Sequence, residues 1–286
     1  MIDSIEGVPY ERLERPGCPL CLQHHQARVI EVAFGMTASV AECPGCRLAY
    51  QTPRPSLEAS LAYMNMRWRS QDAYVADPEQ QQARAQGQLD LIAPVVPGRP
   101  RVLDFGSGAG TFVRVAREAG WDAVGVERST SARARALASN GVDLYPDLAS
   151  VGGGFDLITM WDVVEHLRDP RDTVETLRAH LRAGGWMIFE TGNWESWRRL
   201  TSGDAWPLYL FDHQFYFSPA SLQALVGRAG LGDFRLLPGA QSPPPAHPEE
   251  AGGAEAPGTW DTYRRAVARW PEHAEIDIFV AAARSA

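Results

Sequence analysis

An apolar segment that runs directly into a glycine-rich turn constrains the fold of this chain more than any other feature. The segment is VLDFGSGAG at residues 102–110, and a helical pattern follows it. Glycines at such a turn let the backbone approach a ligand at the carboxyl edge of a sheet. The acid Glu127 ends the next apolar segment, 21 residues beyond Gly106. A carboxylate at this position is suited to hydrogen-bonding a ribose diol.

Strand and helix patterns alternate from residue 101 onward. The expected strands are 102–105, 123–127, 142–145, 155–161, 186–191, 234–237 and 276–283, and the expected helices are 110–119, 129–139, 170–183 and 218–229. This alternation predicts an α/β fold with a mostly parallel, seven-stranded Rossmann-like sheet covered by helices on both faces. Residues 238–257 are rich in Pro, Gly and Ala, and we expect a flexible insertion there, followed by a short helix at about 258–269.

All four cysteines of the chain lie near its N-terminus, in two CxxC pairs. The pairs are Cys18 with Cys21 and Cys43 with Cys46, and 21 residues separate them. This spacing is typical of a zinc ribbon, in which each tight turn supplies two thiolates to a tetrahedral site. Two disulfides or a redox pair are the alternatives, but disulfides need an oxidising compartment and no export signal is evident. We therefore predict a structural zinc ion and a cytoplasmic protein.

Composition and charge exclude several classes of function. The chain has 286 residues and a formal net charge of −8, and no apolar run approaches the roughly 18 residues that a membrane helix needs. The acidic excess disfavours nucleic acid as a partner. All 27 basic residues are arginine, so a Schiff-base or P-loop lysine is excluded. A general base must then be His, Asp, Glu, Tyr or Cys.

Four segments match one known family in order and in spacing: VLDFGSGAG (102–110), WDAVGVERS (121–129), FDLITMWDVVEHLRDP (155–170) and LRAGGWMIFETGN (181–193). Over residues 100–237 the chain resembles class I S-adenosylmethionine-dependent methyltransferases. The third glycine of the dinucleotide fingerprint is replaced by Thr111, which argues against a dinucleotide ligand. The DVVEHL segment and FYFSPASL (215–222) resemble the ubiquinone-biosynthesis-like small-molecule branch. The four-cysteine element is similar in part to sugar C-methyltransferases, although Phe211-Asp212-His213 stands where those tend to carry His-Glu-His.

Pro-rich punctuation at residues 52–55 and 94–100 divides the chain into three expected parts. We expect a zinc-ribbon domain at residues 1–53, a helical linker or cap at 54–98, and the methyltransferase domain with its insertion at 99–286. Within the linker, Ser56 is a plausible N-cap for a helix to about Met66, and a second helix is expected within 70–93.

The resemblance also implies which residues hold S-adenosylmethionine. Gly106, Ser107 and Gly108 line the methionine and ribose portion, while Glu127 holds the ribose hydroxyls with Arg128 beside the adenine. The other implied cofactor residues are Asp104, Asp147, Trp161, Asp162, Tyr63 and Tyr74. Several of these have an equally plain structural reading: Asp147 as the cap of a short helix, Trp161 as core, and the two tyrosines as linker packing.

Methyl transfer to a hydroxyl or an acidic carbon needs a base, and His is the side chain best matched to neutral pH. His213 precedes the aromatic cluster at 215–217, and its family counterpart is a proposed base. His213 is therefore the first candidate for the general base. His166, with Glu165 beside it, is the second candidate, as a catalytic or orienting group. Both histidines also have a structural reading, as buried hydrogen-bonding residues.

The expected function is methyl transfer from S-adenosylmethionine to an oxygen or carbon of a small molecule, such as a sugar or a specialised metabolite. Two alternatives stay open at this point. Some rRNA or tRNA methyltransferases carry zinc ribbons before the same fold, although the acidic charge counts against this reading. A non-catalytic S-adenosyl-binding partner protein is the other, because intact glycines indicate binding and not turnover.

Overall fold

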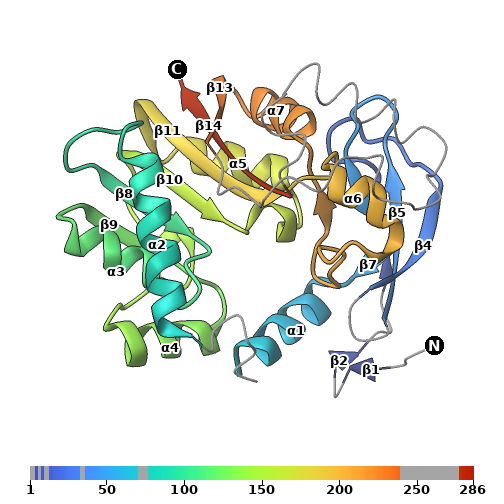
Figure 1. The fold of residues 1–286 in the computed structure, drawn as a ribbon, viewed down its shortest axis with the longest axis horizontal. Helices are drawn as coiled ribbons and strands as arrows, with labels where there is room; N and C mark the ends of the chain where they lie inside the picture. The colour runs from blue at the N-terminus through green and yellow to red at the C-terminus, as the bar shows by residue number, and fades with distance from the viewer. Residues whose placement is uncertain (1–3, 6–7, 10–12, 33–35, 70–76, 239–276) are drawn as a thin grey trace.

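A six-stranded sheet forms the centre of the molecule, in the order β13-β14-β11-β10-β8-β9 (Figure 1). The computed structural model describes residues 4–5, 8–9, 13–32, 36–69, 77–238 and 277–286. Five of these strands run in the same direction and one runs opposite to them, which confirms the expected mostly parallel sheet. The strands that share a direction are β8 (Arg101–Phe105), β9 (Asp122–Val126), β10 (Phe155–Trp161), β11 (Leu181–Gly192) and β13 (Leu231–Leu237), and β14 (Ile278–Ser285) runs opposite to them between β11 and β13.

The expected strand at residues 142–145 is the main departure from the predicted sheet. The segment runs along the edge of β9 but forms only a single parallel bridge, between Tyr145 and Val126. Pro146 follows directly, and it has no N–H to continue the ladder. Among the residues that the structure describes, the sheet therefore has six strands where the sequence indicated seven.

Helices cover both faces of this sheet. One face is covered by α2 (Pro78–Ile92), α3 (Thr111–Glu118) and α4 (Thr130–Asn140), and the other by α5 (Pro170–Arg178) and α7 (Pro219–Arg228). The two cores take alternate residues of β10, with Leu157 in one and Ile158 in the other, because successive side chains of a strand point to opposite faces. The helix expected at 170–183 ends at Arg178, since Leu181 already pairs with Phe155.

The N-terminal sheet is completed by a strand from the C-terminal half of the chain. Its order is β12-β6-β5-β4, and β12 pairs with β6 through Phe215–Tyr50 and Tyr216–Ala49. The strands are β4 (Ala27–Val32), β5 (Met36–Glu42), β6 (Ala49–Gln51) and β12 (Phe215–Tyr216). The smaller elements of this half are β1 (Ser4–Ile5), β2 (Val8–Pro9), β3 (Leu13–Glu14) and β7 (Arg54–Pro55). The ribbon region thus shares a sheet with the segment that follows His213.

Helix α1 (Leu57–Arg69) lies between the two sheets (Figure 1). The Ser129 hydroxyl, at the start of α4, donates to Oδ1 of Asn65 on α1 at 2.8 Å. This contact places α1 across the carboxyl edge of the central sheet. The remaining elements are α6 (Trp197–Ser202) and the 3-10 turns at Leu148–Ser150, Val164–His166 and Gly203–Ala205.

Some expectations fall on residues outside the described part of the chain. These are Tyr74, the helix at 258–269 and all but the first residue of the insertion at 238–257. No helix in the described ranges has the length and apolar character to cross a bilayer.

Candidate active site

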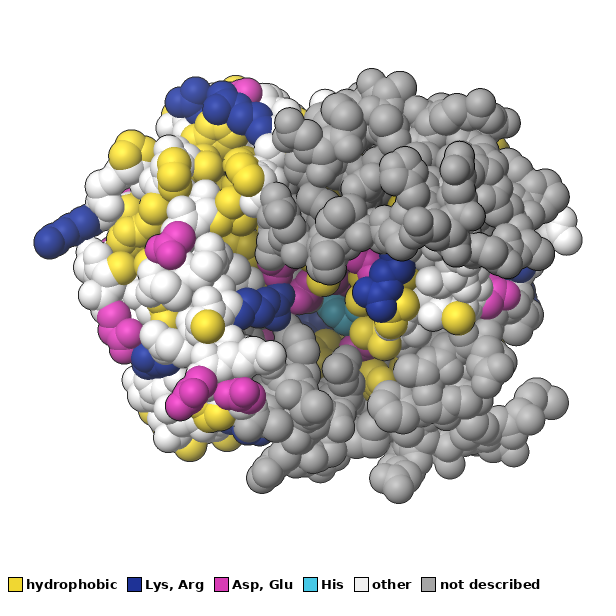
Figure 2. Space-filling view, in the orientation of Figure 1, with side chains coloured by type: hydrophobic (Ala, Val, Ile, Leu, Met, Phe, Trp, Pro, Cys, Tyr) yellow, Lys and Arg dark blue, Asp and Glu magenta, His cyan; other side chains and the backbone are white. Residues whose placement is uncertain are grey.

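A cavity of about 920 Å³ joins the glycine turn to both candidate bases. Its walls come from α1, α2, the turn after β8, the ends of β9 and β10, and the loop at 208–214. Figure 2 shows this face of the molecule hollowed near its middle, with acidic and histidine side chains inside the hollow. The cavity therefore reaches from the expected cofactor residues to the expected acceptor region.

The glycine turn is shaped by one close approach. Gly106 has a φ of +80°, and a Cβ there would lie 2.6 Å from Cγ2 of Val163. Any other residue at this position would be strained and would clash. The N–H groups of Gly106 and Ser107 donate to the carbonyl of Val126 at 2.8 and 3.1 Å, which fixes the turn against β9.

Two carboxyl groups flank the turn. Asp104 is buried and accepts a 2.7 Å hydrogen bond from the Thr159 hydroxyl, and burial raises its pKa to about 7. Glu127 accepts hydrogen bonds from the N–H groups of Gly108 (3.0 Å) and Ser129 (2.7 Å), and burial raises its pKa as well. Asp104 thus braces β8 against β10, while Glu127 stands at the cavity wall where a ribose-binding acid is expected.

The other expected cofactor residues divide into two groups. Arg128, Asp147, Trp161 and Asp162 line the cavity. Asp147 also accepts from the N–H of Ser150 at 2.9 Å, so it both caps a 3-10 turn and faces the cavity. Tyr63 packs against Phe211 with 5.0 Å between ring centroids, and the cavity wall is formed instead by its neighbour Met64.

Arg84 on α2 is a site residue that the sequence did not reveal. Its Nη2 lies 2.5 Å from Oδ2 of Asp162 and also pairs with Glu190. Gln88 adds a 3.2 Å hydrogen bond to Glu190. Both acids are far from α2 in sequence, and nothing in the Gln-rich segment of α2 forms a motif, so only the folded chain brings this cation to the cavity.

The two candidate bases are neighbours. The rings of His166 and His213 meet edge to face, with 4.7 Å between centroids. Nδ1–H of His166 donates to the carbonyl of Asp212 at 2.9 Å. Burial lowers the pKa of His166, but the charge of Asp212 and the hydrogen bond to the Asp212 carbonyl act the other way, and the net shift of the pKa is upward. Both rings line the cavity.

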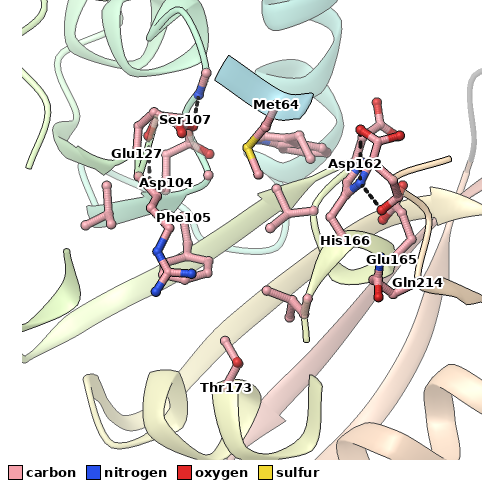
Figure 3. A pocket seen from close by; sticks show the side chains of 18 of the residues that line it. Met64, Asp104, Phe105, Ser107, Glu127, Asp162, Glu165, His166, Thr173 and Gln214 are labelled. Carbon is pink, nitrogen blue, oxygen red and sulfur yellow. Dashed lines mark hydrogen bonds and ion pairs between the residues drawn. The ribbon is translucent and has the colours of Figure 1, made fainter. Parts of the chain in front are cut away.

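Glu165 completes this cluster. One of its oxygens and a ring nitrogen from each of His166 and His213 lie within 4.8 Å of one another (Figure 3 shows Glu165 and His166). Burial raises the pKa of Glu165 to about 8, partly offset by His166 and reinforced by Asp162. The carboxyl is therefore largely protonated at neutral pH. The sequence placed Glu165 beside His166 but gave it no role of its own.

These shifts predict that the ligand-free protein loses stability as the pH rises from 5 to 7. Asp104, with a pKa of about 7, and Glu165, with a pKa of about 8, keep protons that the unfolded chain releases above its ordinary carboxyl pKa. Each retained proton lowers the free energy of unfolding by about 1.4 kcal/mol per pH unit. His166 acts in the same direction, because the stability from its raised pKa is lost as pH rises through that pKa.

Calorimetric melting temperatures measured between pH 5 and 8 check this expectation. The wild type should melt at progressively lower temperature, and Asp104→Asn and Glu165→Gln should each flatten the decline. A melting temperature that climbs over this range would show that these carboxyl groups are ionised in the folded protein.

The aromatic residues after β11 pack against the ribbon and do not line the acceptor end of the cavity. Their cluster includes ribbon residues Val40 and Ala49 together with Trp194, Trp206, Tyr209, Phe211 and Tyr216. Leu208 and Leu210 face the cavity instead. Nε2 of Gln51 on β6 donates to the carbonyl of Phe211 at 3.2 Å, which ties the cluster to the loop that carries His213.

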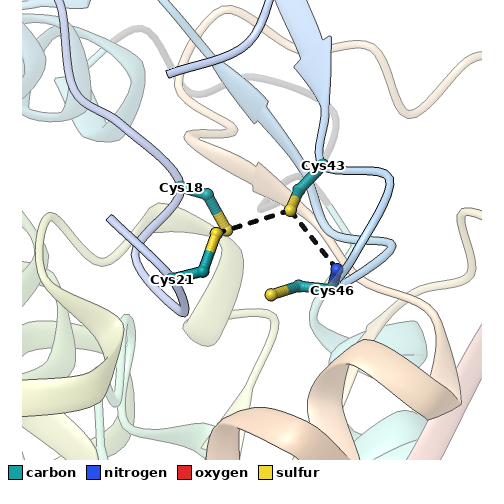
Figure 4. Close-up of side chains that lie close together, drawn as sticks. All are labelled: Cys18, Cys21, Cys43 and Cys46. Atoms are coloured by element: carbon teal, nitrogen blue, oxygen red, sulfur yellow. Dashed lines mark hydrogen bonds between the residues drawn. The ribbon is translucent and has the colours of Figure 1, made fainter. Parts of the chain in front are cut away.

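The four cysteines lie together at the base of the ribbon (Figure 4). Their sulfur atoms are all within 4.8 Å of one another, Sγ of Cys21 lies 3.6 Å from Sγ of Cys43, and all four are free thiols. Four thiolates around zinc at about 2.3 Å place their sulfurs about 3.8 Å apart, so the arrangement fits the metal. Arg47, directly after Cys46, donates to Glu195 at 2.8 Å and links this site to the segment after β11.

Comparisons with known proteins agree with this geometry. The family model described as "Methyltransferase domain" matches residues 78–233. A ubiquinone biosynthesis O-methyltransferase of Cereibacter sphaeroides is 30% identical over 167 residues, covering 53% of this chain and 68% of that protein. One from Bordetella avium is 28% identical over 160 residues, covering 50% and 66%.

Two solved structures share the fold. A S-adenosylmethionine-dependent methyltransferase from Archaeoglobus fulgidus has a TM-score of 0.53 at 17% identity, covering 75% of this chain and 100% of that one. A Thermotoga maritima methyltransferase, described as a possible histamine N-methyltransferase, has a TM-score of 0.50 at 18% identity, covering 77% and 99%. The chain therefore belongs to the methyltransferase-domain family and is a class I S-adenosylmethionine-dependent methyltransferase.

Proposed function

We propose that this enzyme methylates an oxygen or a carbon of a small-molecule acceptor, with His213 as the general base. The observation that carries the proposal is the single cavity lined by both the glycine turn and His213. S-adenosylmethionine supplies a methyl group already activated on a sulfonium. What remains for the protein is alignment, exclusion of water and removal of a proton. The names of the curated relatives favour oxygen as the accepting atom.

Cofactor binding falls to the residues around the glycine turn. Gly106, Ser107 and Gly108 would lie along the methionine and ribose, and Glu127 would accept from the ribose hydroxyls. Arg128 and Asp147 would flank the adenine, with Trp161 and Asp162 near the sulfonium. The fit is supported by the Gly106 turn, which leaves no room for a Cβ, and by the concentration of carboxyl groups along the wall that a cationic ligand would meet.

His213 would take the acceptor proton, and His166 would hold it in place. His213 is buried next to the His166 ring, and His166 is itself fixed by the carbonyl of Asp212. The raised pKa of His166 favours its protonated form, which suits an orienting role. Arg84 would offset the negative charge of Asp162 and Glu190 at the same end of the cavity.

We also propose one structural zinc ion, bound by Cys18, Cys21, Cys43 and Cys46. Four thiolates leave no open position for a substrate, so the metal would act as a staple and not as a catalyst. The expected division into 1–53, 54–98 and 99–286 is kept as part of this proposal. In this scheme the ribbon supports the acceptor end of the cavity through the pairing of β6 with β12.

Glu127→Gln is expected to weaken the binding of S-adenosylhomocysteine roughly 10- to 100-fold, because a hydrogen bond to a charged group is lost. Asp122→Asn is the matched control, since this exposed acid lies at the opposite end of β9. Isothermal titration calorimetry checks both variants. Equal affinity for the Glu127→Gln variant and the wild type would remove Glu127 from the cofactor site.

A further inference from the structure

Two buried side chains in the cavity carry polar atoms that bond to nothing within the described part of the chain. These atoms are Nε2 and Oε1 of Gln214 and Oε2 of Glu165. Both residues are only 3% exposed, and both line the cavity (Figure 3). Buried polar atoms without a partner destabilise a fold. Their presence in a cavity points to a ligand that completes them.

The backbone of Gln214 is fixed on both sides. Its N–H donates to the carbonyl of Glu165 at 2.8 Å, and its carbonyl accepts from the N–H of Gln51 at 2.9 Å. The first bond ties it to the turn that carries His166, and the second ties it to β6 of the ribbon. The residue is therefore anchored through its backbone and is not the tip of a loose loop, which lowers the entropy cost of binding a ligand.

The hydrogen-bonding capacity of the pair selects a ligand class. The Gln214 amide offers two N–H donors and an acceptor oxygen, and burial raises the pKa of Glu165 to about 8, so its carboxyl can donate as well as accept at pH 7. An ammonium group only donates and would leave Nε2 unpaired. A carboxylate only accepts, and it would meet the acidic groups Asp162 and Asp212 in the same cavity. A hydroxyl does both and carries no charge.

We propose that Gln214 and Glu165 form an acceptor-binding pair that selects an uncharged, hydroxyl-bearing substrate next to His213. The inference rests on the proposed function and names the acceptor class for the same site. The hydroxyl can belong to an aromatic ring or to a sugar ring, because both present the same donor and acceptor.

Binding of four probes to the protein saturated with S-adenosylhomocysteine tests the pair. Phenol and methyl glucoside carry hydroxyls, benzylamine carries an ammonium group, and benzoate carries a carboxylate. We expect phenol or methyl glucoside to bind about 10-fold more tightly than the two charged probes, and Gln214→Met to remove most of that preference. Gln86→Met, at an exposed amide of α2 bonded to Asp90, should leave it unchanged. Tighter binding of phenol would indicate an aromatic hydroxyl, and tighter binding of methyl glucoside would indicate a sugar hydroxyl.

Preferential binding of benzylamine or benzoate, no binding of either hydroxyl probe, or an unchanged preference in Gln214→Met would overturn the inference. Failure of S-adenosylhomocysteine to bind the wild type would instead overturn the proposed function. The two failures are therefore distinguishable in the same titrations.

A second readout separates ligand binding from a structural role. Because Gln214→Met removes unsatisfied buried atoms at similar volume, it should raise the melting temperature of the ligand-free protein by about 2–4 °C. If Gln214 has only a structural role, the Gln214→Met variant should melt at a lower temperature and bind the hydroxyl probes as the wild type does. That result would contradict the inference.

Discussion

Replacement of His213 by glutamine is expected to reduce kcat about 10²- to 10⁴-fold, the usual contribution of a general base, while the affinity for S-adenosylhomocysteine stays at the wild-type value. The physical reason is the position of His213 at the acceptor end of the cavity, next to a His166 whose pKa is raised. Glutamine keeps much of the volume of the imidazole but cannot take a proton. Release of S-adenosylhomocysteine during turnover measures kcat, and calorimetry measures the affinity.

His180→Gln provides the matched control for this substitution. His180 is exposed and follows α5, and its Nδ1 is 3.0 Å from the carbonyl of Thr176. His180 itself does not line the cavity. Its replacement should leave both quantities unchanged. A His213→Gln variant that keeps most of its kcat, or that loses cofactor affinity in proportion, would show that His213 packs the loop and does not act as a base.

The second large effect is expected at the ribbon, where Cys43→Ser should abolish zinc binding and strongly destabilise the N-terminal sheet. Structural zinc sites supply apparent binding free energies of about 10–16 kcal/mol in small peptides. Cys43 is also buried in the same core cluster as Leu48, Tyr50 and Phe215. Because β6 pairs with β12, the loss should reach the loop that carries His213. Zinc content by mass spectrometry and hydrogen exchange at Phe215 and Tyr216 report the two effects.

His24→Gln is the control for the ribbon, because this exposed histidine lies close to the first CxxC pair and is not needed as a ligand. It should retain one zinc per chain. Purified protein without stoichiometric zinc under reducing conditions, or a Cys43→Ser variant with unchanged hydrogen exchange in β12, would contradict the proposed staple.

The parts of the site that could be predicted from the sequence are those encoded by contiguous residues. Each of these parts lies within one short segment, and the spacing of its residues indicates the local backbone geometry. They are the Gly106 turn, the acid at Glu127 and the two CxxC pairs. The parallel strands were equally readable, because β8 and β10 are short, mostly apolar segments whose central residues are buried. The strand at 142–145 was overpredicted, since its apolar pattern does not reveal that pairing stops at Pro146.

The parts that could not be predicted depend on contacts between distant segments. Arg84 reaches Asp162 and Glu190 only because α2 packs across the strand ends. The backbone of Gln214 is held by hydrogen bonds to Glu165 and Gln51, which come from different halves of the chain. No local pattern records that Gln214 is buried without a partner for its side chain.

The most direct test of the account is a crystal structure with S-adenosylhomocysteine bound, in which the distance from the His213 ring to the ligand sulfur is measured. The methyl carbon, an acceptor atom at contact distance and one hydrogen bond together place the nearer ring nitrogen within about 7 Å of the sulfur along an open path. The account predicts that separation, with Glu127 against the ribose. A ligand bound away from the glycine turn, or a His213 ring turned into the core with no path to the sulfur, would contradict it.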